Sequence, residues 1–139
     1  MRDAVPVVDI RRAVAEHALA ASDIYLRARA AAGSAIPPGV HSDEQVRAFV
    51  AEVMIAERQT WLAWKGGTAV GVLVLDGNEL DWLYVEPSRQ SQGIGSALLE
   101  HAQGISPNGL ALWAFASNQR ARGFYEHHGF VAVRATDGA

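Results

Sequence analysis

Residues 85–102 read VEPSRQSQGIGSALLEHA and place two glycines, Gly93 and Gly95, between a β-like run and an amphipathic helix. Glycine permits positive φ angles and a close approach of the backbone to a ligand. The first amides of the helix have no intrahelical partner, so they offer hydrogen-bond donors and a partial positive charge to an anion. This junction is therefore either a tight turn that caps the helix or a loop that binds phosphate.

Two common nucleotide-binding motifs do not fit the loop. The dinucleotide motif G-x-G-x-x-G requires a third glycine where this chain has Leu98. A P-loop requires a lysine after its last glycine, and this loop contains no lysine. A phosphate would have to be held by backbone amides together with the polar side chains around the glycines.

The length and composition fit one domain over residues 1–139 and exclude several classes of protein. The net charge of −3 argues against a broad basic surface for nucleic acid. The lack of cysteine excludes disulfides and thiolate metal sites, and the histidines follow no metal-binding spacing, so no metal is expected. No apolar run approaches the roughly 20 residues of a membrane span, and the N-terminus lacks the features of a signal peptide. We therefore expect a cytoplasmic protein with no membrane partner.

The N-terminal part of the chain predicts two helices. Apolar residues recur at steps of three and four from Asp9 to about Ala32, which is typical of one helical stripe; they are Ile10, Val14, Ala18, Ala21, Tyr25 and Ala28. Ser42 followed by Gln45 is a capping-box pattern and predicts the start of a second helix. The expected buried face of this helix consists of Val46, Phe49, Val50 and Val53.

After Arg58 the pattern changes to strands. Three runs linked by KGG and DGN turns predict an antiparallel meander over about residues 59–85. A helix then follows the glycine loop, with an expected buried face of Ile94, Ala97, Leu98 and His101. The rest of the chain predicts a strand at 109–115, a helix at 118–128 and a strand at 130–134. The fold class is thus α+β, with a mostly antiparallel mixed sheet flanked by helices.

Two motifs resemble the signatures of the GNAT-type N-acetyltransferase superfamily. Residues 90–95, QSQGIG, match the family's Q/R-x-x-G-x-G/A loop, with LYVEP before it and SALLEHA after it. Residues 118–130, NQRARGFYEHHGF, resemble the second signature, N-x-x-A-x-x-F-Y-x-x-x-G-F. The resemblance spans about residues 59–133 and extends more loosely to the N-terminal helices.

The resemblance implies a binding site for acetyl-CoA as cosubstrate. In this family the glycine loop holds the pyrophosphate through backbone amides, so no lysine is required, and the neighbouring strand pairs with the pantetheine arm. The implied cofactor-binding residues are Leu83, Tyr84, Val85, Gln90, Ser91, Gln92, Gly93, Ile94, Gly95, Ser96 and Asn118. Asn118 can equally act as a helix N-cap. Arg120 and Arg122 either approach the phosphates or belong to a solvated helix face.

The resemblance also implies acetyl transfer to a primary amine by direct attack in a ternary complex. Tyr125 matches the family's tyrosine that protonates the departing thiolate, and a phenol with a pKa near 10 is protonated at neutral pH. Its other interpretation is simple packing in the helix. Asp81 and Glu79 lie two residues apart in one strand and share a face. Asp81 is the preferred acceptor-orienting group or base acting through water, and Glu79 is a second candidate that lies closer to the turn.

The acceptor and the end of the chain leave alternatives open. The pocket for the amine should be built from residues 25–41, with Tyr25, Arg29 and His41 as candidates, and a small-molecule or peptide amine is possible. Only nine residues follow Phe130, too few for the two C-terminal strands usual in the family. One strand is therefore expected to be missing, either through truncation or because a partner, such as the second chain of a homodimer, supplies it. The alternative function is a non-catalytic coenzyme A-binding sensor or a remnant of the fold.

Overall fold

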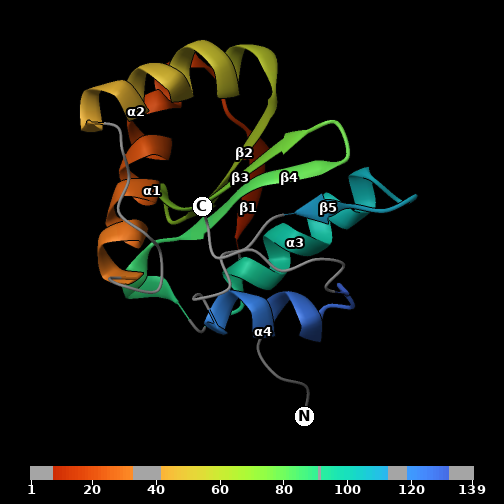
Figure 1. The fold of residues 1–139 in the computed structure, drawn as a ribbon. Helices are drawn as coiled ribbons and strands as arrows, with labels where there is room; N and C mark the ends of the chain where they lie inside the picture. The colour runs from red at the N-terminus through yellow and green to blue at the C-terminus, as the bar shows by residue number, and fades with distance from the viewer. Residues whose placement is uncertain (1–7, 33–41, 91, 113–118, 132–139) are drawn as a thin grey trace.

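The structure is a computed structural model that describes residues 8–32, 42–90, 92–112 and 119–131. A five-stranded sheet carries α1 and α2 on one face and α3 and α4 on the other (Figure 1). The elements are, in chain order, β1 Asp9–Arg12, η1 Ala15–His17, α1 Ala18–Ala32, α2 Asp43–Phe49, η3 Val50–Ile55, β2 Gln59–Lys65, β3 Thr68–Asp76, β4 Glu79–Val85, η4 Pro87–Arg89, α3 Ile94–Ile105, β5 Ala111–Leu112 and α4 Gln119–His127.

The sheet has the strand order β1-β2-β3-β4-β5, and its first four strands pair antiparallel. β5 pairs parallel to β4, which makes the sheet mixed. Gly66 and Gly67 have φ angles of 58° and 81°, the left-handed conformation that a tight hairpin turn requires. The predicted α+β class and the predicted meander are both confirmed.

The predicted start of the first helix is wrong. Asp9–Arg12 form the edge strand β1, which pairs with β2 from Asp9↔Trp64 to Arg12↔Trp61. The edge of β2 offers backbone partners that the helical spacing of the apolar residues does not reveal, because the pairing joins residues about 50 positions apart. The α-helix itself begins only at Ala18, and Val14, expected on its buried face, is exposed.

The second helix begins as predicted and then changes its geometry. The amide of Gln45 donates to Ser42 Oγ at 3.2 Å, and the amide of Ser42 donates to Gln45 Oε1 at 2.8 Å, which confirms the capping box. From Val50 to Ile55 the helix is a π-helix. Its wider turns shift the buried face, so that Val50 and Met54 are buried while Phe49 is 43% exposed. The expectation that Phe49 is buried is therefore wrong.

Helix α3 packs tightly against the centre of the sheet. Its buried residues are Ile94, Leu98, Leu99 and Ala102. The observed buried face is rotated slightly around the helix from the predicted one, because Ala97 and His101, which are predicted to be buried, are only half-buried. A Cβ atom on Gly71 of β3 would lie 2.8 Å from Leu98 Cδ1 and 3.2 Å from Ile94 Cγ2, so the glycine permits this close approach. The first turn of α3, and with it the glycine loop, is thus fixed against β3.

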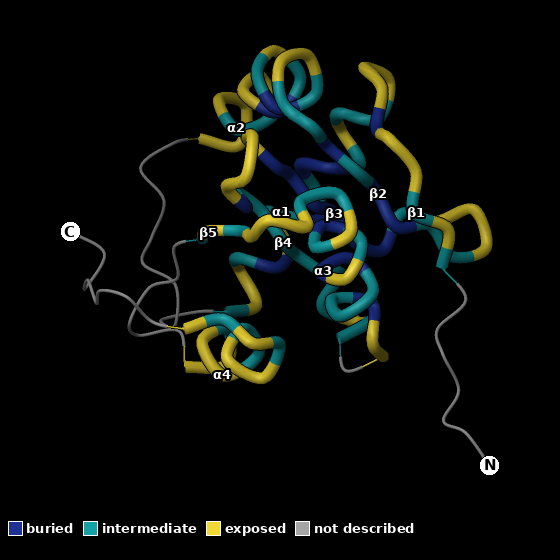
Figure 2. The backbone as a smooth tube through the Cα atoms, turned by 90° about the vertical axis from the view of Figure 1, so that its right-hand side faces the viewer, coloured by how far each residue is buried: buried dark blue, intermediate teal, exposed yellow. Residues whose placement is uncertain are grey.

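The C-terminal elements are only partly described. α4 confirms the predicted last helix, and Figure 2 shows that it is largely exposed, with no fully buried residue. The predicted strand at 109–115 begins as β5, and residues 113–118 lie outside the described residues. Phe130 and Val131 are not in a strand, and the rest of the predicted strand at 130–134 is outside the description, as is any further C-terminal strand. None of the described helices is long and apolar enough to cross a membrane.

A half-buried histidine on α3, His101, makes the stability of the fold depend on pH. His101 Nε2 and Trp61 Nε1 are buried without a hydrogen-bond partner among the described residues, and the two rings meet edge to face at 4.4 Å. The guanidinium of Arg12 lies 5.5 Å from the Trp61 ring centroid. Burial lowers the pKa of His101 below its ordinary value of 6.5. His101 is therefore neutral in the folded protein at neutral pH.

We expect acidification to destabilise the fold through this residue. The pKa of His101 is lower in the folded than in the unfolded state, so the unfolded state binds the proton first as the pH falls through about 6.5. The midpoint temperature of wild-type unfolding, followed by tryptophan fluorescence, should fall between pH 7.5 and about 5.5 more steeply than that of His101→Leu. Equal pH dependence in the two proteins would contradict this prediction.

Candidate functional site

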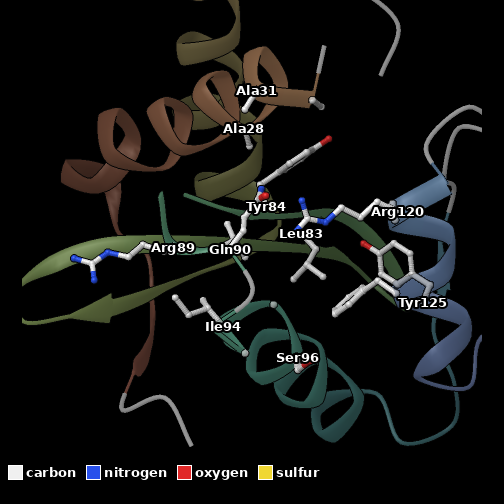
Figure 3. Close-up of a pocket in the computed structure, with 16 residues that line it drawn as sticks. Ala28, Ala31, Leu83, Tyr84, Arg89, Gln90, Ile94, Ser96, Arg120 and Tyr125 are labelled. Atoms are coloured by element: carbon white, nitrogen blue, oxygen red, sulfur yellow. The ribbon is translucent and has the colours of Figure 1, made fainter. Parts of the chain in front are cut away.

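A cavity of about 600 Å³ opens between the end of β4, the first turn of α3, α4 and the C-terminal half of α1 (Figure 3). It brings together segments that are far apart in the sequence. The lining residues are Ala28, Ala31 and Ala32 from α1, Leu83, Tyr84 and Val85 from β4, Arg89, Gln90 and Gly93 from the loop, Ile94, Gly95 and Ser96 from α3, and Arg120, Ala121, Phe124 and Tyr125 from α4.

The glycine loop forms the floor of this cavity at the N-terminus of α3. Gly93 is the N-cap residue, with φ 84° and ψ 5°, a left-handed conformation that disfavours other residues. Gly93 has no side chain that could cap the helix, so the N-cap residue itself leaves the amides of the first turn available to a ligand. A Cβ atom on Gly95 would lie 3.5 Å from Phe124 Cζ and 3.6 Å from Val85 Cγ2. Any larger side chain at position 95 would therefore enter the space between β4 and α4.

Among the described residues, no strand pairs with the edge of β4 that faces α4 where the cavity begins. β4 pairs with β5 only at Glu79↔Ala111 and Leu80↔Leu112 within the described part of the chain. Beyond this point the backbone of Leu83–Val85 lines the cavity. Unpaired strand backbone can accept an extended ligand as if it were a further strand.

A bulge in β4 determines which side chains reach each wall. Val74 pairs with Trp82 and Leu75 pairs with Leu80, so Asp81 has no partner in β3. Two residues on the bulged strand therefore oppose one on its neighbour.

Two tyrosines border the cavity as protonated phenols. Burial raises the pKa of Tyr84 to about 12. Burial, with Tyr84 nearby, raises the pKa of Tyr125 above its ordinary value of 10. The Tyr125 ring packs edge to face on Phe124 and Phe130, and its hydroxyl points into the cavity (Figure 3). Packing and proton donation are therefore compatible at this residue.

The charges in the cavity favour an anion. Arg89 and Arg120 line it, and no carboxylate does so among the described residues. Arg120 extends from α4 towards β4, whereas Arg89 points away from α4 (Figure 3). An electropositive site at a helix N-terminus suits a phosphate-bearing ligand.

The two predicted carboxylates lie elsewhere. Asp81 Oδ2 accepts a hydrogen bond from Arg58 Nη1 at 3.0 Å, and the same guanidinium lies 3.7 Å from Asp76. Burial raises the pKa of Asp81, while the charge of Arg58 opposes the rise. Glu79 is exposed at the start of β4. The structure thus brings neither Asp81 nor Glu79 into the cavity lining.

The remaining candidates divide into three groups. Ser91, Asn118 and His41 lie outside the described residues. Gln92 and Arg122 are exposed and do not line the cavity. Tyr25 and Arg29 also lie outside the lining; Tyr25 stacks on Trp82 at 4.1 Å and accepts a hydrogen bond from Arg29. No group of potential metal ligands was found in the described part of the chain.

Sequence reasoning expected residues 25–41 to build a pocket but did not single out the alanines of α1 as its lining. Ala28, Ala31 and Ala32 line the cavity, and Ala28 is predicted only as a core residue. Their signal in the sequence was three small residues at helical spacing in the alanine-rich end of the helix. That spacing alone does not distinguish a cavity wall from a packed interface.

The comparisons with known proteins agree with this geometry. Residues 56–132, more than half of the chain, match the family model described as an acetyltransferase (GNAT) domain. The chain therefore belongs to the GNAT acetyltransferase family. The peptidyl-lysine N-acetyltransferase YjaB of Salmonella typhimurium is 41% identical over 61 residues, which cover 44% of this chain and 41% of YjaB. The chain spans about half the length of the curated relatives it matches.

Solved structures support the same fold. The solution structure of apo-form YjaB from Escherichia coli matches with a TM-score of 0.70 and 26% identity, over 87% of this chain and 80% of that one. The PaiA N-acetyltransferase of Thermoplasma acidophilum, solved in complex with coenzyme A, matches with a TM-score of 0.72 and 22% identity, over 96% and 94% of the two chains. At this identity the second match shows the fold alone.

Proposed function

We propose that this protein transfers the acetyl group of acetyl-CoA to a primary amine. The observation that carries the proposal is the convergence, in one cavity, of the α3 N-terminus, the end of β4 at Leu83–Val85 and Tyr125. The coenzyme A-bound state of a protein with the same fold supports the choice of donor.

In the proposed complex, successive parts of acetyl-CoA contact the glycine loop, the end of β4 and the space beside α4. Amides of the loop and of the first turn of α3 bind the pyrophosphate, assisted by the positive charge of Arg89 or Arg120. The backbone of Leu83–Val85 pairs with the pantetheine arm and directs the thioester towards α4. Gly95 keeps the passage between β4 and α4 open for the arm.

The transfer forms one bond and breaks another. The neutral amine attacks the thioester carbonyl, a C–N bond forms, the C–S bond breaks, and the thiolate takes a proton from the Tyr125 hydroxyl. The raised pKa of Tyr125 keeps the phenol protonated at neutral pH, and the phenolate left after the transfer regains a proton from solvent. The amine loses its own proton to solvent. A contribution from Asp81 or Glu79 has to pass through water, because Arg58 holds Asp81 outside the cavity lining.

We propose a lysine side chain of a peptide as the acceptor. The support is the printed activity of relatives such as YjaB and the Escherichia coli protein YiaC, which is 33% identical over 86 residues. The matched segments cover only part of those relatives. The glycine loop and α4 lie within residues 56–132, which match the family model.

Calorimetric titration with acetyl-CoA, followed by assays of thiol release, tests the proposal. We expect saturable donor binding and turnover with lysine-containing peptides, with mass spectrometry locating the acetyl group on the lysine amine. Binding without turnover on peptides, aminoglycosides or simple amines would favour the alternative of a coenzyme A sensor. No binding by a folded protein would contradict the donor site itself.

A further inference from the structure

An ion pair joins the α1 wall of the cavity to the loop that follows β4. Arg27 Nε donates to both carboxylate oxygens of Glu86 at 2.9 Å, and Arg27 Nη2 donates to Oε2 at 2.7 Å. The two side chains are 53% and 18% exposed. The contact is therefore a multiply hydrogen-bonded, charge-assisted pair with a fixed geometry.

Glu86 directly follows the last residue of β4, at the start of the segment that leads to the glycine loop. Its amide donates to Val70 O at 2.9 Å, which anchors it to β3. Its carbonyl accepts from the amide of Arg89 at 2.8 Å, which closes the turn leading to Gln90. Residues on both sides of Glu86 line the cavity: Val85 before it, and Arg89 and Gln90 after it.

Arg27 lies on α1 next to residues that line the cavity, as Glu86 does on the other side of the ion pair. It directly precedes Ala28, and the next turn of the helix carries Ala31 and Ala32, all three on the cavity wall. The ion pair at Arg27 therefore links this alanine wall to the loop, across a separation of 59 residues.

We propose that Arg27 and Glu86 are positioning residues for the donor, and that their ion pair sets the affinity for coenzyme A. The inference rests on the proposed function, because it takes the cavity as the coenzyme site. Neither side chain lines the cavity, so the pair acts through the walls that it holds together. An ion pair at this degree of exposure stabilises one arrangement only modestly. Breaking it should weaken coenzyme binding by about fivefold.

A second ion pair on the same helix provides a matched control. Arg47 Nη2 lies 2.9 Å from Asp23 Oδ1, with side chains 40% and 29% exposed, and it joins α1 to α2 rather than to the loop. Breaking this pair also removes one ionic contact of α1, at a comparable exposure and away from the cavity lining.

The test is calorimetric titration of coenzyme A into Glu86→Gln, Arg27→Met and the double variant, beside Asp23→Asn and Arg47→Met. We expect each cavity variant to raise the Kd about fivefold, the double variant to add little, and the control variants to leave the Kd unchanged. With acetyl-CoA, the KM for the donor should rise while kcat at saturation stays the same. Thermal unfolding establishes that every variant is folded.

The outcomes separate this inference from the proposed function. An unchanged Kd in Glu86→Gln and Arg27→Met, or an equal increase in the control variants, would overturn the positioning role alone. A wild-type protein that does not bind coenzyme A would overturn the proposed function, and this inference with it.

Discussion

Replacement of Tyr125 by phenylalanine should lower kcat for acetyl transfer by about 10²-fold or more, with little change in the Kd for coenzyme A. The substitution removes only the hydroxyl, and the ring keeps its contacts with Phe124 and Phe130. General acid catalysis by a positioned side chain contributes about 10²–10⁴-fold. Steady-state thiol release gives kcat, and calorimetry gives the Kd.

Tyr84→Phe is the matched control for this prediction. Tyr84 is also a buried tyrosine on the cavity wall, and it packs against Tyr25 and Trp82 on the α1 side. Its loss should leave kcat within a few-fold of wild type. Equal losses in the two variants would show that the hydroxyl of Tyr125 has no special role, and an unchanged kcat in Tyr125→Phe would exclude it as the proton donor.

The double substitution Gly93→Asp and Gly95→Asp should abolish measurable coenzyme A binding, with a loss of about 10²-fold or more. Aspartate at position 93 adopts a φ of 84° at a cost of about 1–2 kcal/mol. Its carboxylate also competes with phosphate for the helix N-terminus. At position 95 the side chain enters the passage beside Phe124 and Val85. These effects act together on affinity, which calorimetry measures directly.

Gly104→Asp serves as the control for the added charge. Gly104 lies on the same helix α3, and a Cβ atom there has no neighbour within 4 Å. This variant should bind coenzyme A as wild type does. Wild-type affinity in the double variant, with the fold retained, would mean that the phosphates bind elsewhere.

The parts of the fold that follow from local chemistry were predictable. The hairpin turn at Gly66 and Gly67, the capping box at Ser42, and the loop at Gly93 each combine a residue type with a backbone conformation that few others adopt. These signals do not depend on distant partners. They were sufficient to predict the meander, the start of α2 and the glycine loop that lines the cavity.

The parts that failed depend on tertiary contacts. Residues 9–12, DIRR, are mostly charged and form a strand only because the edge of β2 pairs with them. The environment of Asp81 is set by Arg58, 23 residues earlier in the chain. The exposure of Phe49 follows from a π-helical segment for which the sequence carried no separate signal. In each case the sequence pattern was compatible with a second arrangement that longer-range packing selected.

The bulge at Asp81 adds one residue to β4 and so changes the face of the sheet to which the side chains after it point. Leu80 packs on the side of α3, and a regular strand would place Trp82 and Tyr84 on that side as well. Because of the extra residue the alternation is reversed after Asp81. Leu83 and Val85 therefore pack on the side of α3, while Trp82 and Tyr84 pack on the side of α1. The faces that β4 presents beyond Asp81 are thus set by this extra residue, and a strand that paired Asp81 regularly with β3 would exchange the two walls without altering any side chain.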